Sequence, residues 1–259
     1  MGGPTRDGQA HATPPSRRIA GELRRAILDG ELVPGQRLPS ERELASKHGT
    51  ARNTARQAIA ILQAEGLVDA QHGRGVFVRQ PRMFLRVAHD RYARHHRDAG
   101  RPPFRTEAEA QGLVPRVEVR AIQQVPAPDW VAGQLTLGAG ELVLRRRNRY
   151  LADEEPVELA DTYVPLMIAD GTSLMHEVPA VGGIYAALEQ LGHRLARIDE
   201  QVTARMPLAE ETEALALMAG VPVLELRHTS YDERGIAFEV THSILPADRN
   251  ALTFQLPVD

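Results

Sequence analysis

Arginine and glycine residues able to hold phosphate are concentrated in one stretch of the chain, residues 35–78. The guanidinium group of arginine donates paired hydrogen bonds to phosphate oxygens and to the O6 and N7 atoms of guanine. A glycine-rich turn lets a backbone amide come close to a phosphate. The stretch therefore has the groups that DNA binding requires. The residues we expect to contribute are Ser40, Arg42, Arg52, Asn53, Thr54, Arg56, His72, Gly73 and Arg74.

The sequence lacks the residue patterns of the common catalytic and metal sites. It has no cysteine, which excludes disulfide frameworks, zinc ribbons and thiol nucleophiles. No HExxH, GxSxG or Walker-type motif is present. The adjacent pair His95-His96 cannot point both rings at one metal ion, and Gly73-Arg74-Gly75 lacks the third glycine of a dinucleotide-binding loop. We therefore expect no enzyme activity, no metal site and no cofactor.

Two helices separated by a tight turn are predicted to position the arginines. Ser40 is a good helix N-cap, and Glu43, three residues later, completes a capping box that satisfies two free amide groups. We expect this helix to end near His48 with Gly49 in the left-handed conformation. Thr50 is expected to cap the next helix, so the turn between the helices is short.

The second of these helices has one apolar and one polar face. The apolar residues recur at helical spacing and are Ala55, Ala58, Ile59 and Leu62. The residues facing away from them are Asn53, Arg56, Gln57 and Ala60, with Arg52 at the edge. After Gly66, residues 67–70 and 76–78 are expected to form a hairpin. Two helices, a tight turn and such a hairpin make a winged helix-turn-helix, whose second helix fits the major groove.

Linked motifs follow one another through this stretch in a fixed order. They are Leu38-Pro39-Ser40-Glu41-Arg42-Glu43-Leu44, Arg52-x-Thr54-x-Arg56-Gln57-Ala58, Glu65-Gly66-Leu67 and His72-Gly73-Arg74-Gly75. Together they resemble the GntR family of bacterial transcription regulators over residues 16–79.

Each candidate contact has an expected role on DNA. The side chains expected to contact bases or adjacent phosphates are Arg42, Arg52 and Arg56. The groups expected to hold phosphates and fix the register are Ser40, Thr54 and the amide of Gly73. Arg74 or His72 would touch the minor groove or the backbone at the wing. An ion pair with a neighbouring carboxylate is the alternative role for Arg42.

Charge is distributed unevenly along the 259 residues, a length that suits two domains. Residues 1–80 have a net charge of +4 and the remainder −7, which fits phosphate binding by the front part alone. Residues 1–15, rich in glycine, proline, threonine and histidine, are expected to form a disordered arm. No apolar run approaches the roughly 18 residues of a membrane span, so we expect a cytoplasmic, nucleoid-associated protein.

The remaining segments are predicted from their periodicity. Ser16 is expected to cap a first helix, 17–28, and residues 80–103 to form a linker whose arginines are solvated or add phosphate contacts. Residues 104–259 are predicted to be an α+β domain, with a mainly antiparallel sheet and helices on one face. The expected strands are 114–122, 141–150, 157–164, 198–205, 223–231 and 236–245. The expected helices are 129–135, 184–192 and 208–219.

Arg145, Arg147 and Arg149 alternate along one expected strand and therefore share one face of the sheet. Three guanidinium groups on one face repel one another unless they are solvated, paired or offered to an anion. Nearby acidic residues in the sequence are Glu154, Glu155, Glu158 and Asp161. The pattern leaves open both a surface of ion pairs and a pocket for a small molecule.

A second series of motifs runs through the C-terminal domain. They are Arg147-x-Arg149, Ala152-Asp153-x-Glu155-Pro156-Val157, Asp161-Thr162-Tyr163-Val164-Pro165, Gly183-Ile184-Tyr185-x-x-Leu188-Glu189, Gly235 with Glu239, and Asp248-Arg249. They resemble the UTRA effector domain of the HutC subfamily, whose fold is shared with chorismate lyase. The resemblance implies an effector pocket formed by Phe104, Arg105, Thr106, Arg147, Arg149, Glu158, Tyr185 and Glu239.

Two departures from the subfamily pattern bear on the ligand. Gly183 stands where sugar-phosphate-binding members have serine, and Ile244-Leu245-Pro246 stands where they often have tyrosines. We therefore expect a more apolar pocket than a sugar-phosphate site, for a ligand that the sequence does not identify.

The resemblance implies a homodimeric repressor that binds a pseudo-palindromic operator in double-stranded DNA and is released by a small-molecule effector. Two alternatives stay open. One is a constitutive repressor whose second domain only dimerises, and the other is a chorismate-lyase-like enzyme with an attached DNA-binding module. The fold alone does not decide between them.

Overall fold

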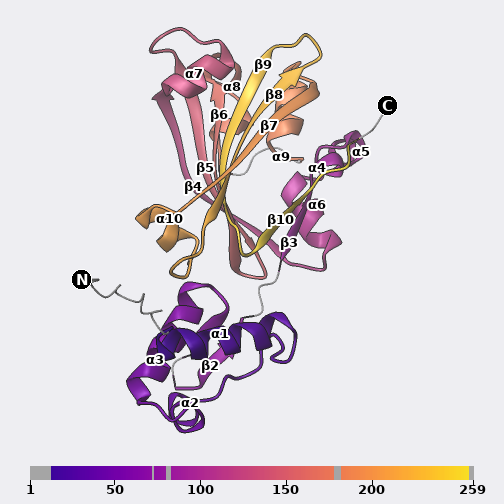
Figure 1. Ribbon diagram of the computed structural model, residues 1–259. Coiled ribbons are helices and arrows are strands. Elements are labelled where there is room, and N and C mark those ends of the chain that lie inside the picture. The colour runs from indigo at the N-terminus through magenta and orange to yellow at the C-terminus, as the bar shows by residue number, and fades with distance from the viewer. Residues whose placement is uncertain (1–12, 72, 80–82, 178–181, 257–259) are drawn as a thin grey trace, which may run out of the picture. The chain divides into compact units, whose positions relative to one another are not determined.

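Helices and a hairpin build the first of the two units into which the chain divides, residues 1–80 and 81–259. The computed structural model describes residues 13–71, 73–79, 83–177 and 182–256 (Figure 1). The elements of the first unit are α1 (Pro15–Leu28), α2 (Glu41–Lys47), α3 (Arg52–Ala64), β1 (Val68–Gln71) and β2 (Gly75–Val78). Residues 1–12 of the expected disordered arm lie outside the described residues.

The predicted capping box at the start of α2 is confirmed. The backbone amide of Glu43 donates to Ser40 Oγ at 3.3 Å, and the amide of Ser40 donates to Glu43 Oε2 at 2.7 Å. Gly49 has a φ of +58° in the turn to α3, as a left-handed glycine after a helix should. Helix α2 therefore begins and ends as the sequence predicted.

Two other predicted caps are wrong. Helix α1 has Pro14 at its N-cap position and Pro15 in its first turn, so Ser16 is a buried residue inside the helix. Proline suits the first turn because it has no amide hydrogen that needs a partner. Helix α3 is preceded by Ala51, without a side-chain cap. The amide of Thr50 instead donates to the Ala45 carbonyl of α2, which makes the turn one residue longer.

The buried stripe of α3 is confirmed and forms the centre of the first unit's core. Its members are Ala55, Ala58, Ile59 and Leu62, all at most 5% exposed. They pack with Ile19 and Leu23 of α1, Leu44 of α2 and Val68 and Val78 of the hairpin. This core fixes the outward face of α3 relative to the rest of the unit.

The second unit is organised around an antiparallel sheet, with the strand order β4-β5-β6-β9-β8-β7 among the described residues. Its strands are β4 (Pro115–Pro126), β5 (Leu142–Ala152), β6 (Glu155–Pro165), β7 (Leu195–Arg205), β8 (Val223–Asp232) and β9 (Ala237–Pro246). Each expected strand is present, and the predicted α+β class is confirmed.

Helices cover both faces of this sheet, whereas the sequence predicted one covered face. Helices α7 (Asp129–Leu135) and α10 (Ala209–Ala214) pack on the face that carries Leu159 and Tyr163 of β6. The opposite face is covered near Leu144 and Val164 by α8 (Leu166–Ala169), the short 3-10 turn Ser173–Met175 and α9 (Gly183–Gln190). Strands β6 and β9 are buried on both sides, so each face needs a cover.

Helix α10 is shorter than the predicted helix 208–219. Ala216 has a φ of +47°, and the amide of Leu217 donates to the Thr212 carbonyl at 2.9 Å, a closure that ends helices. The turn buries Leu215 and Leu217 against the sheet. Tertiary packing therefore overrides the helical pattern at this point.

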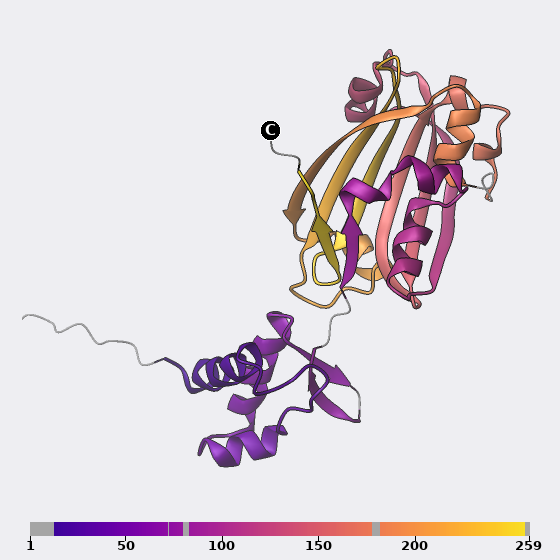
Figure 2. The same ribbon diagram turned by 90° about the vertical axis from the view of Figure 1, so that its right-hand side faces the viewer.

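Most of the segment expected as a linker forms elements of the second unit. These are β3 (Phe84–Val87), α4 (Ala88–Arg91) and α5 (Arg94–Asp98), followed by α6 (Pro103–Ala110). Strand β3 pairs in parallel with β10 (Asn250–Thr253), and the segment lies over one face of the sheet (Figure 2). Arg86 is 1% exposed, so the expectation of solvated arginines is wrong there. Its partners come from distant parts of the chain, which a local pattern cannot show.

Among the described helices, none has the length and apolar composition needed to cross a membrane.

Candidate functional site

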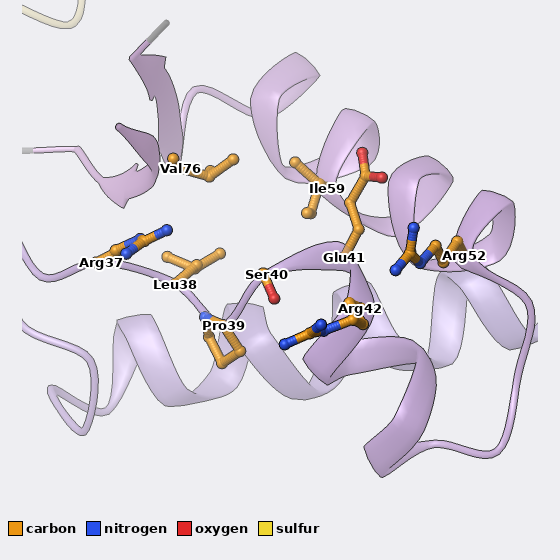
Figure 3. A pocket seen from close by; sticks show the side chains of 10 residues that line it. Arg37, Leu38, Pro39, Ser40, Glu41, Arg42, Arg52, Ile59 and Val76 are labelled. Atoms are coloured by element: carbon orange, nitrogen blue, oxygen red, sulfur yellow. The ribbon is translucent and has the colours of Figure 1, made fainter. Parts of the chain in front are cut away.

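The outward face of α3 and the start of α2 carry exposed arginines on the first unit. Arg52, Asn53 and Arg56 of α3 and Arg42 of α2 are exposed, whereas Thr54 is half-buried. A cleft of about 490 Å³ lies between these helix starts and β2 (Figure 3). It is lined by Arg37, Leu38, Pro39, Ser40, Glu41, Arg42, Arg52, Ile59, Gly75 and Val76. The structure thus brings Arg37, Arg42 and Arg52 to one cleft.

The hairpin is fixed to the segment that precedes α2 by backbone hydrogen bonds. The amide of Leu38 donates to the Val76 carbonyl at 2.8 Å, and the amide of Val78 donates to the Gln36 carbonyl at 2.7 Å. Gly75 has a φ of +119°, and a Cβ there would lie 2.7 Å from Nε of Arg37. Glycine is therefore required where the hairpin meets this arginine. Sequence reasoning missed Arg37, although it directly precedes the motif that carries Ser40.

Arg56 is held by an acidic residue that the sequence analysis did not select. Its Nε lies 2.9 Å from Oε1 of Glu41, and its Nη2 lies 3.1 Å from Oε2. The hydrogen bond to Arg56 lowers the pKa of Glu41. Helix α2 therefore orients an α3 arginine. The sequence had left open an ion pair as the alternative role of Arg42. Among the described residues, Arg42 forms no such ion pair.

The tip of the hairpin contains the remaining candidate DNA contacts. Gly73 is exposed with a φ of +72°, and exposed Arg74 places its guanidinium 5.7 Å from the centre of the Phe77 ring. His72 lies outside the described residues.

The alternating arginines of β5 form a surface of ion pairs, one of the two arrangements that the sequence had left open. Arg145 and Arg147 both bind Asp161, the latter at 3.0 Å from Nε to Oδ1. Arg149 Nε donates to Glu118 Oε2 at 2.6 Å. These side chains lie on the sheet face that α7 and α10 cover.

The opposite face of the sheet contains a cavity of about 750 Å³. Of the residues expected at the effector pocket, those lining it are Phe104, Arg105, Glu158, Tyr185 and Glu239. Those that do not line it are Thr106, Arg147 and Arg149. The β5 residues that do line it are Arg146, Asn148 and Tyr150. Sequence reasoning missed these three because it selected the alternate positions of β5, which belong to the other face.

Glu239 is the centre of a hydrogen-bond network on the cavity wall. It is 1% exposed, and its Oε2 accepts from Ser230 at 2.7 Å and from Tyr185 at 3.2 Å. His228 Nε2 lies 3.1 Å from the same oxygen, and Thr241 donates to Oε1. Burial opposes ionisation, but His228 and the hydrogen bonds outweigh it and lower the pKa of Glu239. The wall therefore holds a buried, hydrogen-bonded carboxylate.

A second carboxylate of the cavity, Glu158, is paired with Arg86. Its Oε2 lies 2.7 Å from Nη2 of Arg86, and the two side chains are 3% and 1% exposed. Burial opposes ionisation, but the charges of Arg86 and Arg91 lower the pKa of Glu158. Arg91 also faces Glu107 at 3.8 Å, and burial raises the pKa of Glu107. The chain between the first unit and α6 thus supplies two cations to the cavity region.

Within the described residues, no three His, Cys, Asp or Glu side chains are grouped as metal ligands would be.

Comparisons with known proteins match both units. The model of "Bacterial regulatory proteins, gntR family" matches residues 15–78, and the model of the "UTRA domain" matches residues 110–251.

Individual relatives match over most of their length. The HTH-type transcriptional repressor NagR of Bacillus subtilis is 28% identical over 90% of this chain and 90% of its own. The HTH-type transcriptional regulator Rv0792c of Mycobacterium tuberculosis is 31% identical over 88% of this chain and 81% of its own. The crystal structure of PhnF from Mycobacterium smegmatis matches with a TM-score of 0.59 and 26% identity, over 93% of this chain and 100% of that one.

Proposed function

The chain belongs to the GntR family of bacterial regulatory proteins and carries a UTRA domain, and we propose that it is a repressor controlled by a small molecule bound in the cavity. The family and the relatives are transcription regulators and not enzymes. The predicted GntR and UTRA resemblance is thereby confirmed.

The proposed DNA-binding surface consists of the first unit's exposed arginines and its hairpin tip. Arg52 and Arg56 lie on the outward face of α3, the helix that a winged helix-turn-helix inserts into the major groove. Ser40 and the amide of Gly73 would hold phosphates on either side. The ion pair with Glu41 would orient the guanidinium of Arg56 toward a base edge.

The observation that carries the effector part of the proposal is the cavity itself. A domain that served only for dimerisation would fill this space with packed apolar side chains, because protein interiors are close-packed. Instead, about 750 Å³ is lined by Glu239, Arg146 and Tyr185 among others. A volume of this size, mainly apolar with a few buried polar groups, suits a small ligand.

The proposed coupling between the two sites runs through β3. This strand starts six residues after β2 ends, and its Arg86 binds Glu158 of the cavity wall. An effector with different affinities for two arrangements of this contact would change the arrangement of the DNA-binding units. We expect a homodimer acting on a pseudo-palindromic operator in the cytoplasm, and release of DNA when the effector binds.

The DNA-binding part of the proposal is tested first. Sequences selected from genomic fragments by the purified protein should share a pseudo-palindrome. Arg52→Ala and Arg56→Ala should each weaken operator binding by about 1–3 kcal/mol and relax base preference at one position. Arg197→Ala, an exposed arginine of the second unit, is the matched control and should bind normally. Equal weakening on operator and random DNA would assign a phosphate contact instead.

The effector part is tested by a thermal-shift screen against a metabolite library. A compound that stabilises the protein and also changes its operator affinity supports the proposal. Stabilisation by operator DNA alone, with no response to any compound, would favour a constitutive repressor.

A further inference from the structure

Arg146 is a buried cation in the cavity wall that no carboxylate of the described residues neutralises. Its side chain is 1% exposed. Its Nη1 donates to the backbone carbonyls of Leu174 and His176, the latter at 2.7 Å, and its Nη2 donates to the carbonyl of Glu177 at 3.3 Å. Its Nε is buried without a hydrogen-bond partner. Burial lowers the pKa of Arg146, with Tyr150 as the influence in the other direction. Carbonyl groups have no net charge, so the positive charge of this side chain stays uncompensated.

Each of the other buried charges of the region lies next to an opposite charge or accepts hydrogen bonds. Glu158 is bound by Arg86 at 2.7 Å, and Arg91 faces Glu107 at 3.8 Å. Glu239 accepts hydrogen bonds on both of its oxygens. A ligand with a single negative charge would therefore complete the charge balance at Arg146. Among the described residues, the cavity lining contains four arginines, Arg91, Arg101, Arg105 and Arg146, and four glutamates, Glu109, Glu158, Glu177 and Glu239. The lining therefore offers no excess of positive charge to a dianion such as a phosphate monoester.

The rest of the lining is suited to an apolar body. The rings of Phe104 and Tyr150 lie 5.0 Å apart, and those of Tyr92 and Tyr185 lie 5.7 Å apart. All four side chains line the cavity. Aromatic walls of this kind bind flat or branched apolar groups through burial and edge-to-face contacts.

One acceptor next to the cation is also unused. Asn148, two residues along β5, is 5% exposed and lines the cavity. Its Nδ2 donates to the hydroxyl of Tyr150 at 3.3 Å, but its Oδ1 is buried without a partner. A buried amide oxygen without a donor is costly, so a ligand donor at this position would be stabilising.

We infer that the effector is a largely apolar monocarboxylate whose carboxylate is bound by Arg146 and whose hydroxyl or amino group donates to Asn148. The carboxylate would accept from Nε, which has no hydrogen-bond partner, and from Nη2, a paired contact that arginine makes well. This inference rests on the proposed function, since it assigns the ligand class of the same cavity. Arg146 would be the residue that selects one negative charge.

The test uses the full-length protein and a matched set of compounds. The carboxylates are benzoate, phenylacetate, phenylpropionate and their hydroxyl- and amino-substituted forms, each compared with its neutral amide and with phenyl phosphate. Dissociation constants are measured by calorimetry, and release of operator DNA by fluorescence anisotropy. Carboxylates should bind at least about tenfold more tightly than their amides, the effect of one charge-assisted hydrogen bond.

Variants at two adjacent positions of β5 separate the cavity from the outer face. Arg146→Gln should lose about tenfold or more in carboxylate affinity, and Arg146→Lys should retain part of it. Arg147→Gln removes the same charge from the opposite face and should bind carboxylates normally. If Arg146→Gln does not fold, the Arg146→Lys variant and the comparison of acids with amides on the unchanged protein decide the question.

The ligand class is wrong if amides or phenyl phosphate bind more tightly than the acids, if no carboxylate binds, or if Arg146→Gln binds the acids equally well. The proposed function still stands in those cases when any other metabolite binds and alters operator affinity. Both conclusions fail if the protein binds its operator and responds to no small molecule.

Discussion

Replacing Glu158 by glutamine should destabilise the second unit strongly, because it leaves Arg86 as a buried charge without a counterion. The two side chains are 3% and 1% exposed, with 2.7 Å between Oε2 and Nη2. Two unit charges about 4 Å apart interact by about 4 kcal/mol at an effective dielectric constant of 20. Removing one member of a buried pair costs about 3–5 kcal/mol in measured cases. We therefore expect Glu158→Gln to lose about 3 kcal/mol of unfolding free energy.

The sole tryptophan of the chain allows the unfolding free energy of the second unit to be measured without a signal from the first unit. Trp130 lies in α7, with its ring 5.7 Å from that of Tyr163, so its fluorescence reports unfolding of the second unit. Urea titrations at pH 7 should show the loss in Glu158→Gln. Arg147→Met, which breaks a half-exposed pair with Asp161, is the control and should change the free energy by less than about 1 kcal/mol.

The direction of the Glu158 pKa shift predicts how the loss of stability in Glu158→Gln depends on pH. The pKa of Glu158 is lower in the folded protein than in the unfolded chain, so its ionisation stabilises the fold. That contribution is complete above about pH 4.3, the usual glutamate pKa, and is lost as the pH falls through the folded value. The difference between the unchanged protein and Glu158→Gln should therefore shrink in acid.

A double variant tests the reasoning directly. Replacing both members, as in Arg86→Met with Glu158→Met, removes the unpaired charge and should cost clearly less than the sum of the two single changes. Additive losses, or a loss below about 1 kcal/mol in Glu158→Gln, would refute the assignment of this pair as a buried, coupled interaction.

Three further predictions concern other parts of the molecule. Ser40→Ala removes the accepting oxygen of the capping box and should cost about 1 kcal/mol, seen as faster hydrogen exchange of the α2 amides. Glu41→Gln removes a negative charge beside Arg56 and should raise the affinity for random DNA several-fold, measured by anisotropy at two salt concentrations; weaker binding would contradict this. Burial opposes ionisation of Asp232, but hydrogen bonds from Arg234 and backbone amides lower its pKa to about 2. Asp232→Asn should therefore lower the free energy of unfolding by about 2 kcal/mol at pH 7, and this difference should disappear as the pH falls through about 2. Urea titrations followed by Trp130 fluorescence measure it.

The sequence predicted the first unit well because its signals are local. The capping box of Ser40 and Glu43 and the apolar stripe of α3 depend on spacings of three and four residues. Each is confirmed, together with the strands of the large sheet. The failures at Ser16 and Thr50 were single-residue choices, where a proline or a longer turn took the place of a side-chain cap.

The cavity was harder to predict because its residues meet only through the fold. The alternation of β5 correctly placed Arg145, Arg147 and Arg149 on one face, but it could not show which face would be hollow. Position along the strand changes the role completely, since Arg146 lines the cavity and Arg147 pairs with Asp161. Arg86 was assigned to a solvated linker because its partners lie 72 and 164 residues further along the chain.

The buried charges around the cavity are better explained by binding than by stability. Replacing a buried ion pair by packed apolar residues is often neutral or stabilising, so Arg86 and Glu158 are a poor way to stabilise a fold. Arg146 contributes even less to the stability of the fold, since no carboxylate among the described residues offsets the cost of its burial. Folding energetics alone would favour an apolar side chain at that position. A site that must recognise a charged ligand requires the cation, and the cost of its burial is recovered when the ligand binds. The same reasoning makes ligand-dependent stabilisation of the second unit the expected signature of the effector, largest where Arg146 is intact.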